Sequence, residues 1–195
     1  MKLKDIISNH NLEFENGGTD KNSTHSYIEH FYEGAFEKYR TRKVSVLEIG
    51  ISQGFSFRLW KEYFQNAKLI VGIDNRPEAV HPRNKEIEGV TYHFGDAYTQ
   101  EMVKKLPKFD IIIDDGCHQT DYQVRAIELY LPLLKKDGIY VIEDIQHEYP
   151  KYTKFPDPYK MLSESVPENY NHSFYDLRHI RNRQDDSLMV IRHDK

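Results

Sequence analysis

The spacing of hydrophobic and polar positions changes along this chain at about residue 44. From there on, short runs of apolar and β-branched residues alternate with segments in which apolar residues recur every three or four positions. Runs of the first kind are typical of strands buried on both faces, and segments of the second kind are typical of amphipathic helices. The alternation therefore predicts βαβ units built around a mostly parallel sheet.

Helices are predicted between these runs. One helix follows from Phe57, Trp60 and Phe64, which share one face. Another follows from an apolar repeat that has Thr120 as its N-terminal cap and Gly138 just beyond its end. The expected strands are 44–50, 68–74, 90–94, 109–115, 139–142, 173–180 and 187–193.

The last two expected strands are separated only by a short polar segment, so they are expected to pair antiparallel. The fold class that follows is a doubly wound α/β sheet of seven strands, mostly parallel, with an antiparallel C-terminal strand. Residues 23–40 show helical spacing and are expected to cover the sheet as a lid or edge segment. Residues 146–170 contain four prolines and are expected to form a loop with one short helix. The expected division is an N-terminal helical segment, 1–40, and one compact domain, 41–195.

Composition narrows the class of protein. The chain has 195 residues, of which 38% are hydrophobic, enough for one folded domain with a sizeable core. It carries 27 Lys plus Arg against 31 Asp plus Glu, a net charge of −4, and the basic residues are scattered among the acidic ones. A nucleic-acid partner is therefore disfavoured.

The sequence also bears on the compartment. It contains no apolar run of the length that a signal peptide or a membrane span requires, so no membrane partner is expected. Cys117 is the only cysteine, which excludes an intrachain disulfide and a thiolate-rich zinc site. A reducing cytoplasm is the simplest expectation.

Candidate binding residues stand where the first two expected strands end. In open α/β sheets, ligands bind beyond the carboxyl ends of the strands. Glu48 is followed by Gly50, Ser52 and Gly54, and the glycines permit a tight turn and a close approach of the backbone to a ligand. Asp74 ends the second strand, where its carboxylate is placed to accept both hydroxyls of a ribose; the alternative is an Asp that caps a turn.

The third strand end completes this pattern. Asp96, followed by Ala97, is placed to accept a proton from an adenine amino group, and Asp114 at the end of the fourth strand is assigned to the same cofactor site. The order of these residues at successive strand ends predicts a nucleoside cofactor. Ser52 stands where the dinucleotide motif G-x-G-x-x-G has its second glycine, so NAD and FAD are disfavoured.

Carboxylates gather at the ends of the fourth and fifth expected strands. Asp114 and Asp115 end one strand, Glu143 and Asp144 end the other, and neighbouring strands are only about 4.8 Å apart. Like charges at that spacing are costly without a positive charge between them, and an all-oxygen set suits Mg²⁺ better than zinc. The alternative is that some of these carboxylates cap helices or pair with Lys or Arg. His118, on the turn after Asp115, is placed to take a proton from a metal-bound hydroxyl.

These motifs resemble those of the class I S-adenosylmethionine-dependent methyltransferases. EIGISQG matches their first motif, acidic-x-Gly-x-Gly-x-Gly, apart from Ser52. With GTDKNSTHSY, GIDNRP, DDGCH and IEDIQHEYP, the sequence over roughly 17–150 is similar to the metal-dependent sugar O-methyltransferases of the mycinamicin and tylosin type and their cephalosporin-hydroxylase-like relatives. The resemblance implies a Rossmann-like methyltransferase sheet, with S-adenosylmethionine and Mg²⁺ as cofactors. It also implies that Asp115, Glu143 and Asp144 ligate the metal and that His118 is the general base.

Further segments resemble parts of that family. Gly18 to Lys21, with His25 and Tyr27, resembles a segment that closes over cofactor or substrate, although a plain capping turn explains it nearly as well. His147 and Tyr149 follow the carboxylates and either line an acceptor site or serve packing. Only about 40 residues precede the first strand, which leaves an acceptor pocket that is open or completed by another subunit of a homo-oligomer.

The expected function is methyl transfer to a sugar hydroxyl, on a free sugar, a nucleotide-linked sugar or a glycoside. One rival is a methyltransferase for another metal-chelating acceptor, such as a catechol. A second rival is a non-catalytic cofactor-binding module whose catalysis lies in a partner chain. His118 beside the carboxylates argues against that module, because a binding module needs no base.

Overall fold

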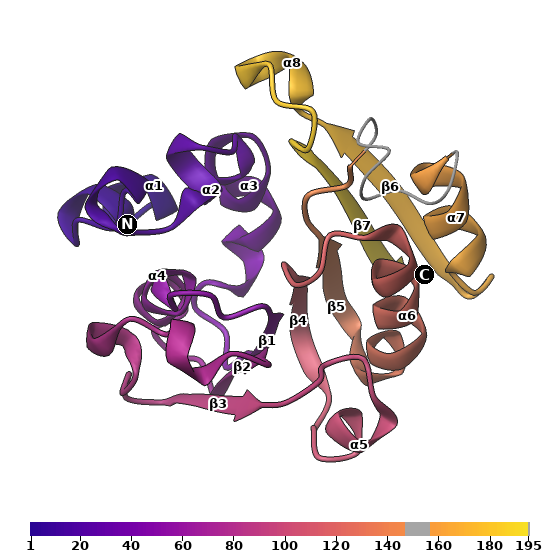
Figure 1. Cartoon of the computed structure of the whole chain (residues 1–195), viewed down its shortest axis with the longest axis horizontal. Helices are drawn as coiled ribbons and strands as arrows, with labels where there is room; N and C mark the ends of the chain where they lie inside the picture. Colours follow the sequence, from indigo (N-terminus) through magenta and orange to yellow (C-terminus); the bar gives the residue numbers. More distant parts are fainter. Residues whose placement is uncertain (147–156, 195) are drawn as a thin grey trace.

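A seven-stranded sheet forms the centre of the computed structural model, which describes residues 1–146 and 157–194 (Figure 1). The strand order is β3-β2-β1-β4-β5-β7-β6. Strands β1 to β5 pair in parallel, and β7 lies antiparallel between β5 and β6. The strands are β1 Ser45–Ile49, β2 Leu69–Asp74, β3 Val90–Phe94, β4 Phe109–Asp114, β5 Leu134–Ile142, β6 Tyr170–Asp176 and β7 Ser187–His193. The predicted fold class is confirmed.

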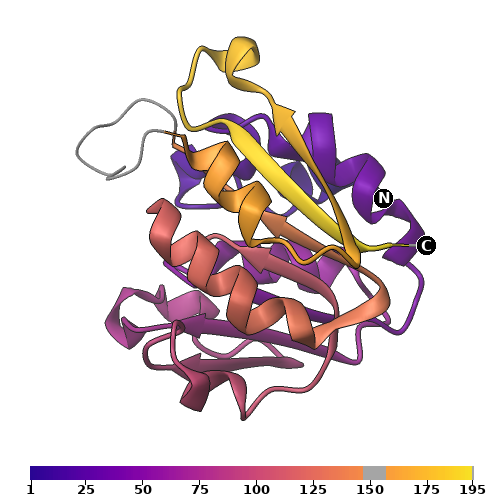
Figure 2. The ribbon, with the colours of Figure 1, turned by 90° about the vertical axis from the view of Figure 1, so that its right-hand side faces the viewer.

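The alternation of side chains along each strand separates two hydrophobic cores. On β1, Val46 joins one core, whereas Leu47 and Ile49 join the other. The first core also receives the N-terminal helices and α4 (Phe55–Tyr63), and the second receives α5 (Gln100–Val103), α6 (Thr120–Tyr130) and α7 (Pro158–Ser165). Figure 2 shows α6 and α7 in front of the sheet and the N-terminal helices behind it. Both faces of the central strands β1, β2 and β4 are covered, which is why these strands are buried almost throughout, whereas the edge strands β3 and β6 are partly exposed.

The N-terminal segment differs from the single helix that was predicted over 23–40. The structure has α1 (Leu3–Asn9), which was not predicted, and then several short helical pieces. The continuous helical stretch begins only near Tyr27, and its first part has π-helical geometry, which recurs at functional sites in proteins. The pieces are η1 Phe14–Asn16, α2 Asp20–Ser23, η2 Ile28–Tyr32, α3 Glu33–Phe36 and η3 Glu37–Tyr39. The division at residue 40 stays a prediction.

Two predicted boundaries around β5 were wrong. Gln119, not Thr120, occupies the N-cap position of α6, and η6 (Leu131–Leu133) ends that helical stretch. Gly138 lies inside β5, which begins at Leu134, and not just beyond a helix. A Cβ atom at Gly138 would lie 2.8 Å from the Lys135 carbonyl oxygen and 2.9 Å from the Asp110 carbonyl oxygen, so the glycine permits close backbone packing within β5 and against β4 and does not mark a helix end.

The C-terminal strand pair confirms the predicted antiparallel arrangement, but the first strand is shifted. It ends at Asp176 instead of residue 180, and the chain continues into α8 (Arg178–Arg181). Asp176 causes this break, because its carboxylate accepts hydrogen bonds from both the backbone and the side chain of Arg178.

The short helix that was predicted within 146–170 is α7. His147 and Tyr149 lie outside the described residues. The surface turns before the third strand form η4 (Pro77–Ala79) and η5 (Pro82–Asn84). Among the helices that the structure describes, none has both the length and the apolar character needed to cross a membrane.

Candidate active site

A cavity of about 700 Å³ lies at the carboxyl ends of β1 to β5. Its size is typical of sites for small molecules. The segment around Gly18 to Lys21 contributes to its wall from the N-terminal part of the chain. The predicted residues that line it are Gly50, Ser52, Gly54, Asp74, Asp96, Ala97, Asp115, His118 and Asp144. Glu48, Asp114 and Glu143 are not among its lining residues.

Asp74 organises the loop that follows β1. One oxygen of its carboxylate accepts hydrogen bonds from the backbone N–H groups of Ile51 and Ser52, at 2.9 and 3.0 Å. The other accepts from the N–H of Arg76 at 2.9 Å. Asp74 therefore caps this loop, as one alternative predicted, and also lines the cavity; its contact with a ribose stays a prediction.

The loop after β1 uses the left-handed region of the backbone repeatedly. Gly50, Ser52 and Gly54 have φ values of 92°, 46° and 81°. At Gly50 a Cβ atom would lie 2.0 Å from the carbonyl oxygen of Asp115, so only glycine permits β1 and β4 to approach there. Ser52 adopts the left-handed conformation that glycine, the residue in the resembled motif, adopts without steric cost.

The end of β3 is tied to the end of β4. Asp96 is exposed, and its carboxylate accepts a hydrogen bond from the N–H of Tyr98. The carbonyl of Ala97 accepts from Tyr130, and the Tyr98 hydroxyl accepts from the N–H of Cys117 at 2.8 Å. These hydrogen bonds fix the position of the segment after β3 relative to the segment after β4, on one side of the cavity.

Glu48 and Asp114 lie beneath the cavity and support it. Glu48 is fully buried and accepts a hydrogen bond from the indole N–H of Trp60 at 2.7 Å. Burial raises the pKa of Glu48 to about 7, against the opposing effect of the Lys21 charge. Burial likewise raises the pKa of Asp114 to about 7. The structure therefore places both predicted cofactor residues in the protein interior.

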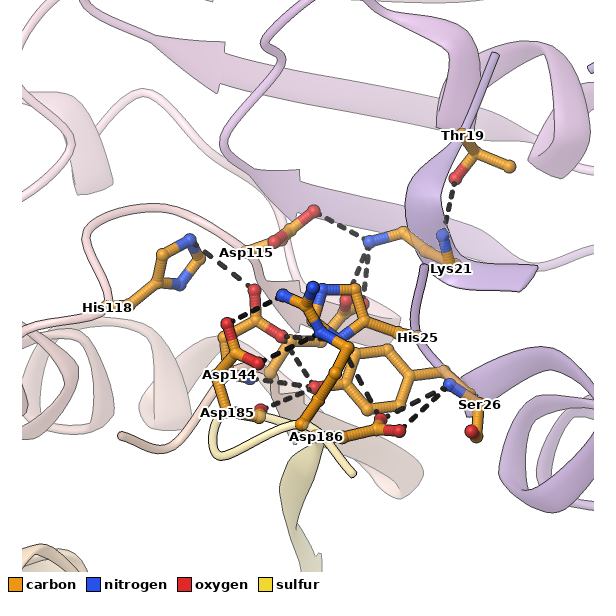
Figure 3. A network of polar contacts seen from close by, with 12 residues as sticks. Thr19, Lys21, His25, Ser26, Asp115, His118, Asp144, Asp185 and Asp186 are labelled. Carbon is orange, nitrogen blue, oxygen red and sulfur yellow. Dashed lines mark hydrogen bonds and ion pairs between the residues drawn. The ribbon is translucent and has the colours of Figure 1, made fainter. Parts of the chain in front are cut away.

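Asp115, His118 and Asp144 form a cluster that faces the cavity (Figure 3). One potential ligand atom from each lies within 4.8 Å of the others, and Nε2 of His118 is 3.6 Å from Oδ2 of Asp144. Burial raises the pKa of Asp144, and the neighbouring histidines His25 and His118 oppose this rise. Two carboxylates and one imidazole converging at a cavity suit a divalent cation.

Glu143, the third predicted ligand, does not face this cluster. Both of its oxygens accept hydrogen bonds from Nζ of Lys21 at 2.8 Å, and the hydroxyl of Tyr32 donates to it as well. Its side chain is 2% exposed. Burial raises the pKa of Glu143 well above its usual range, against the opposing charge of Lys21.

Lys21 is the functional candidate to which the sequence assigned no role of its own. Its Nζ atom also lies 2.7 Å from Oδ2 of Asp115 and 3.4 Å from a carboxylate oxygen of Glu48. Burial acts to lower the pKa of Lys21, but the charges of Asp115, Glu143 and Glu48 hold it well above its ordinary value. The sequence pointed to Lys21 only indirectly, through the alternative that some of the carboxylates at these strand ends pair with Lys or Arg.

The same N-terminal segment supports Asp144 from behind. The hydroxyl of Tyr27 donates a hydrogen bond to Oδ1 of Asp144 at 2.5 Å, and His25 stacks on the Tyr27 ring. The backbone N–H of Ser26 bonds to both oxygens of Asp186, which precedes β7 (Figure 3). The N-terminal segment, the end of β5 and the residues just before β7 thus meet around the carboxylate of Asp144.

Residues 47–145, about half of the chain, match the family described as a methyltransferase domain. The chain belongs to this family, in agreement with the resemblance seen in its motifs. Among curated proteins it is 33% identical, over 68% of its length, to 8-demethyl-8-alpha-L-rhamnosyl tetracenomycin-C 2'-O-methyltransferase of Streptomyces olivaceus. It is also 33% identical, over 71% of its length, to demethylmacrocin O-methyltransferase of Streptomyces fradiae.

The chain spans 36% of the length of each of these two relatives. A solved structure with the same fold is MycE methyltransferase from the mycinamycin biosynthetic pathway, in complex with Mg, SAH and mycinamycin VI. The similarity covers all of this chain and 54% of that chain, with a TM-score of 0.75 and 21% sequence identity. The predicted relation to macrolide sugar O-methyltransferases is confirmed at the level of family and fold.

Proposed function

We propose that this chain is an S-adenosylmethionine- and Mg²⁺-dependent O-methyltransferase domain that methylates a sugar hydroxyl. The observation that carries the proposal is that the loop after β1 and the cluster of Asp115, His118 and Asp144 line the same cavity. The relatives named above support the class of reaction, because they are sugar O-methyltransferases. The solved structure with the same fold contains Mg and SAH.

The cofactor is assigned to the side of the cavity formed by the ends of β1, β2 and β3. The loop from Gly50 to Gly54 brings backbone to the cavity surface, and Asp74 and Asp96 offer carboxylates to the ribose hydroxyls and to the adenine amino group. Glu48 and Asp114 are buried beneath this surface, where Glu48 accepts a hydrogen bond from Trp60 of α4 and Asp114 accepts one from the N–H of Gly116.

The cation is assigned to Asp115 and Asp144, which face the cavity, with Glu143 as the third carboxylate behind them. When bound, a divalent cation supplies a Lewis acid that lowers the pKa of an acceptor hydroxyl. Within the chain, Tyr27 holds Asp144 in place by a hydrogen bond, and Lys21 is bonded to both Asp115 and Glu143.

The general base is assigned to His118. Its side chain is 31% exposed, so it reaches the cavity, and the carboxylate of Asp144 at 3.6 Å stabilises the imidazolium that forms when it takes the acceptor proton. The sulfonium already carries an activated methyl group. The remaining work of the protein is therefore alignment of the acceptor oxygen with that methyl group, without a covalent intermediate.

The test is turnover of S-adenosylmethionine against a panel of sugar nucleotides, free sugars and glycosides, with and without EDTA. Release of S-adenosylhomocysteine with a sugar acceptor, lost in EDTA and restored by Mg²⁺, supports the proposal. Turnover with catechols and not with any sugar would assign the chain to another acceptor class. Tighter binding of NAD than of S-adenosylmethionine would overturn the proposal.

A further inference from the structure

The ammonium group of Lys21 lies at the point where three strand ends bring their carboxylates together. Its Nζ atom is 2.7 Å from Asp115, 2.8 Å from both oxygens of Glu143 and 3.4 Å from Glu48. The side chain is 1% exposed, yet it comes from α2, in the N-terminal segment, while its partners end β4, β5 and β1. A lysine this deeply buried is costly unless its charge is fully paired.

This ammonium is bonded to oxygens of Asp115 and Glu143, two of the carboxylates to which the cation is assigned. Mg²⁺ binds its oxygen ligands at about 2.0–2.1 Å and demands near-ideal octahedral geometry. An ammonium that holds both oxygens of Glu143 and one of Asp115 occupies donor atoms that such a cation requires. Two positive charges are also mutually repulsive at this range, so the lysine and the cation do not share these oxygens freely.

We propose that Lys21 competes with the divalent cation for the carboxylates of Asp115 and Glu143, and thereby sets the affinity of the metal site. This inference rests on the proposed function in that it takes the acid cluster to be a cation site. Glu48 is the partner that remains for Lys21 when the cation binds, since it is not among the assigned ligands and already lies 3.4 Å away. Lys21 is thus a positioning residue, and it couples the cation site to the N-terminal segment.

The segment that carries Lys21 is built to hold it there. Gly18 packs against the backbone of Leu12, where a Cβ atom would lie 1.9 Å from the carbonyl oxygen, and the Thr19 side chain accepts a hydrogen bond from the N–H of Lys21. The same segment continues to Tyr27, which bonds to Asp144. Cation binding at Asp115 and Asp144 therefore acts on both ends of one stretch of chain.

The experiment is calorimetric titration of Mg²⁺ into the wild type and into Lys21→Met, in the absence of cofactor and acceptor. Loss of the competing ammonium should tighten Mg²⁺ binding by about tenfold or more. Lys135→Met is the matched control, because it removes the same charge from a 2.7 Å Lys–Asp pair with Asp110, at the opposite end of β4. That control should bind Mg²⁺ as the wild type does.

Two further variants separate the possible explanations. Lys21→Arg keeps the positive charge, so its Mg²⁺ affinity should stay as weak as that of the wild type. If Lys21→Met folds only when Mg²⁺ is present, the cation is replacing the lost ammonium, and this result also supports competition. Adding Glu143→Gln to Lys21→Met should remove the gain in affinity, because one of the freed carboxylates is then gone.

If Lys21→Met binds Mg²⁺ no more tightly than the wild type, and the wild type does bind it, the inference about Lys21 is overturned while the proposed function stands. Absence of Mg²⁺ binding in every variant overturns the metal part of the proposed function as well.

Discussion

His118 and Asp144 face each other across the end of the β4–β5 pair, with Nε2 of the imidazole 3.6 Å from Oδ2 of the carboxylate. The histidine side chain is 31% exposed and the carboxylate only 11%, so the imidazole presents itself to the cavity with the acid behind it. Asp144 reaches this position from a left-handed backbone conformation, with φ at 56°. Such a conformation is uncommon for a non-glycine residue and often marks a functional position.

Replacement of His118 by alanine tests its role as a base. If His118 takes the acceptor proton, turnover should fall about 10²–10⁴-fold, while the affinity for S-adenosylmethionine stays nearly unchanged. Steady-state kinetics and calorimetry measure the two quantities separately. His179→Ala, on the exposed surface of α8, is the control and should retain turnover. Lost Mg²⁺ affinity in His118→Ala would make the residue a ligand instead of a base.

Asp74 provides the test of the cofactor assignment. Its carboxylate holds the loop after β1 through two backbone N–H groups, accepts a third hydrogen bond from the N–H of Arg76, and is assigned to the ribose. Asp74→Ala should therefore weaken S-adenosylmethionine binding by about 1.5–3 kcal/mol, the scale of lost hydrogen bonds to a charged group. Calorimetry measures the affinity, and Asp137→Ala, at the opposite end of the sheet, serves as the control. Unchanged affinity in Asp74→Ala would refute the assignment.

The requirement for a cation gives a third prediction. EDTA should abolish turnover and Mg²⁺ should restore it, because the cation held by these carboxylates is what lowers the pKa of the acceptor hydroxyl. S-adenosylmethionine binding should largely survive EDTA, since its assigned contacts lie on β1 to β3. The double variant Glu143→Ala, Asp144→Ala should lose turnover, whereas Glu101→Ala with Asp137→Ala removes two charges elsewhere and should not. Full turnover of the first pair in EDTA would show that these carboxylates are structural.

The parallel strands could be predicted from sequence because their physical cause is local. Apolar runs such as 109–115 are buried by helices on both faces of the sheet, so their composition alone identifies them. The element boundaries that were predicted wrongly depend on contacts of single residues, and such contacts leave no repeating pattern in the sequence. Asp176 ends β6 by bonding to Arg178, and Gly138 inside β5 permits close packing against the backbone of Lys135 and Asp110.

The candidate site was predicted unevenly for a similar reason. Residues that follow strand ends, such as Asp74, Asp115 and His118, could be placed at one cavity because strand order brings the ends together. Lys21 could not be placed there, because 94 residues separate it from Asp115 and 122 from Glu143. No periodic pattern links a short N-terminal helix to a particular strand end, so its contact depends on the complete fold.

The loop after β1 gives the last prediction, which concerns stability. Gly50→Ala should destabilise the fold by more than about 2 kcal/mol, because its Cβ atom would lie 2.0 Å from the Asp115 carbonyl oxygen at a φ of 92°. Ser52→Gly should instead stabilise the fold by up to about 1 kcal/mol, because glycine adopts the left-handed conformation at φ 46° without the steric cost that serine carries. Urea unfolding followed by circular dichroism measures both changes. Gly34→Ala is the control, because a Cβ atom there meets nothing within 4 Å and the residue lies in helix α3, where alanine is favoured. A loss of stability in Ser52→Gly comparable to that in Gly50→Ala would show that the serine side chain, and not the backbone conformation, is what this position requires.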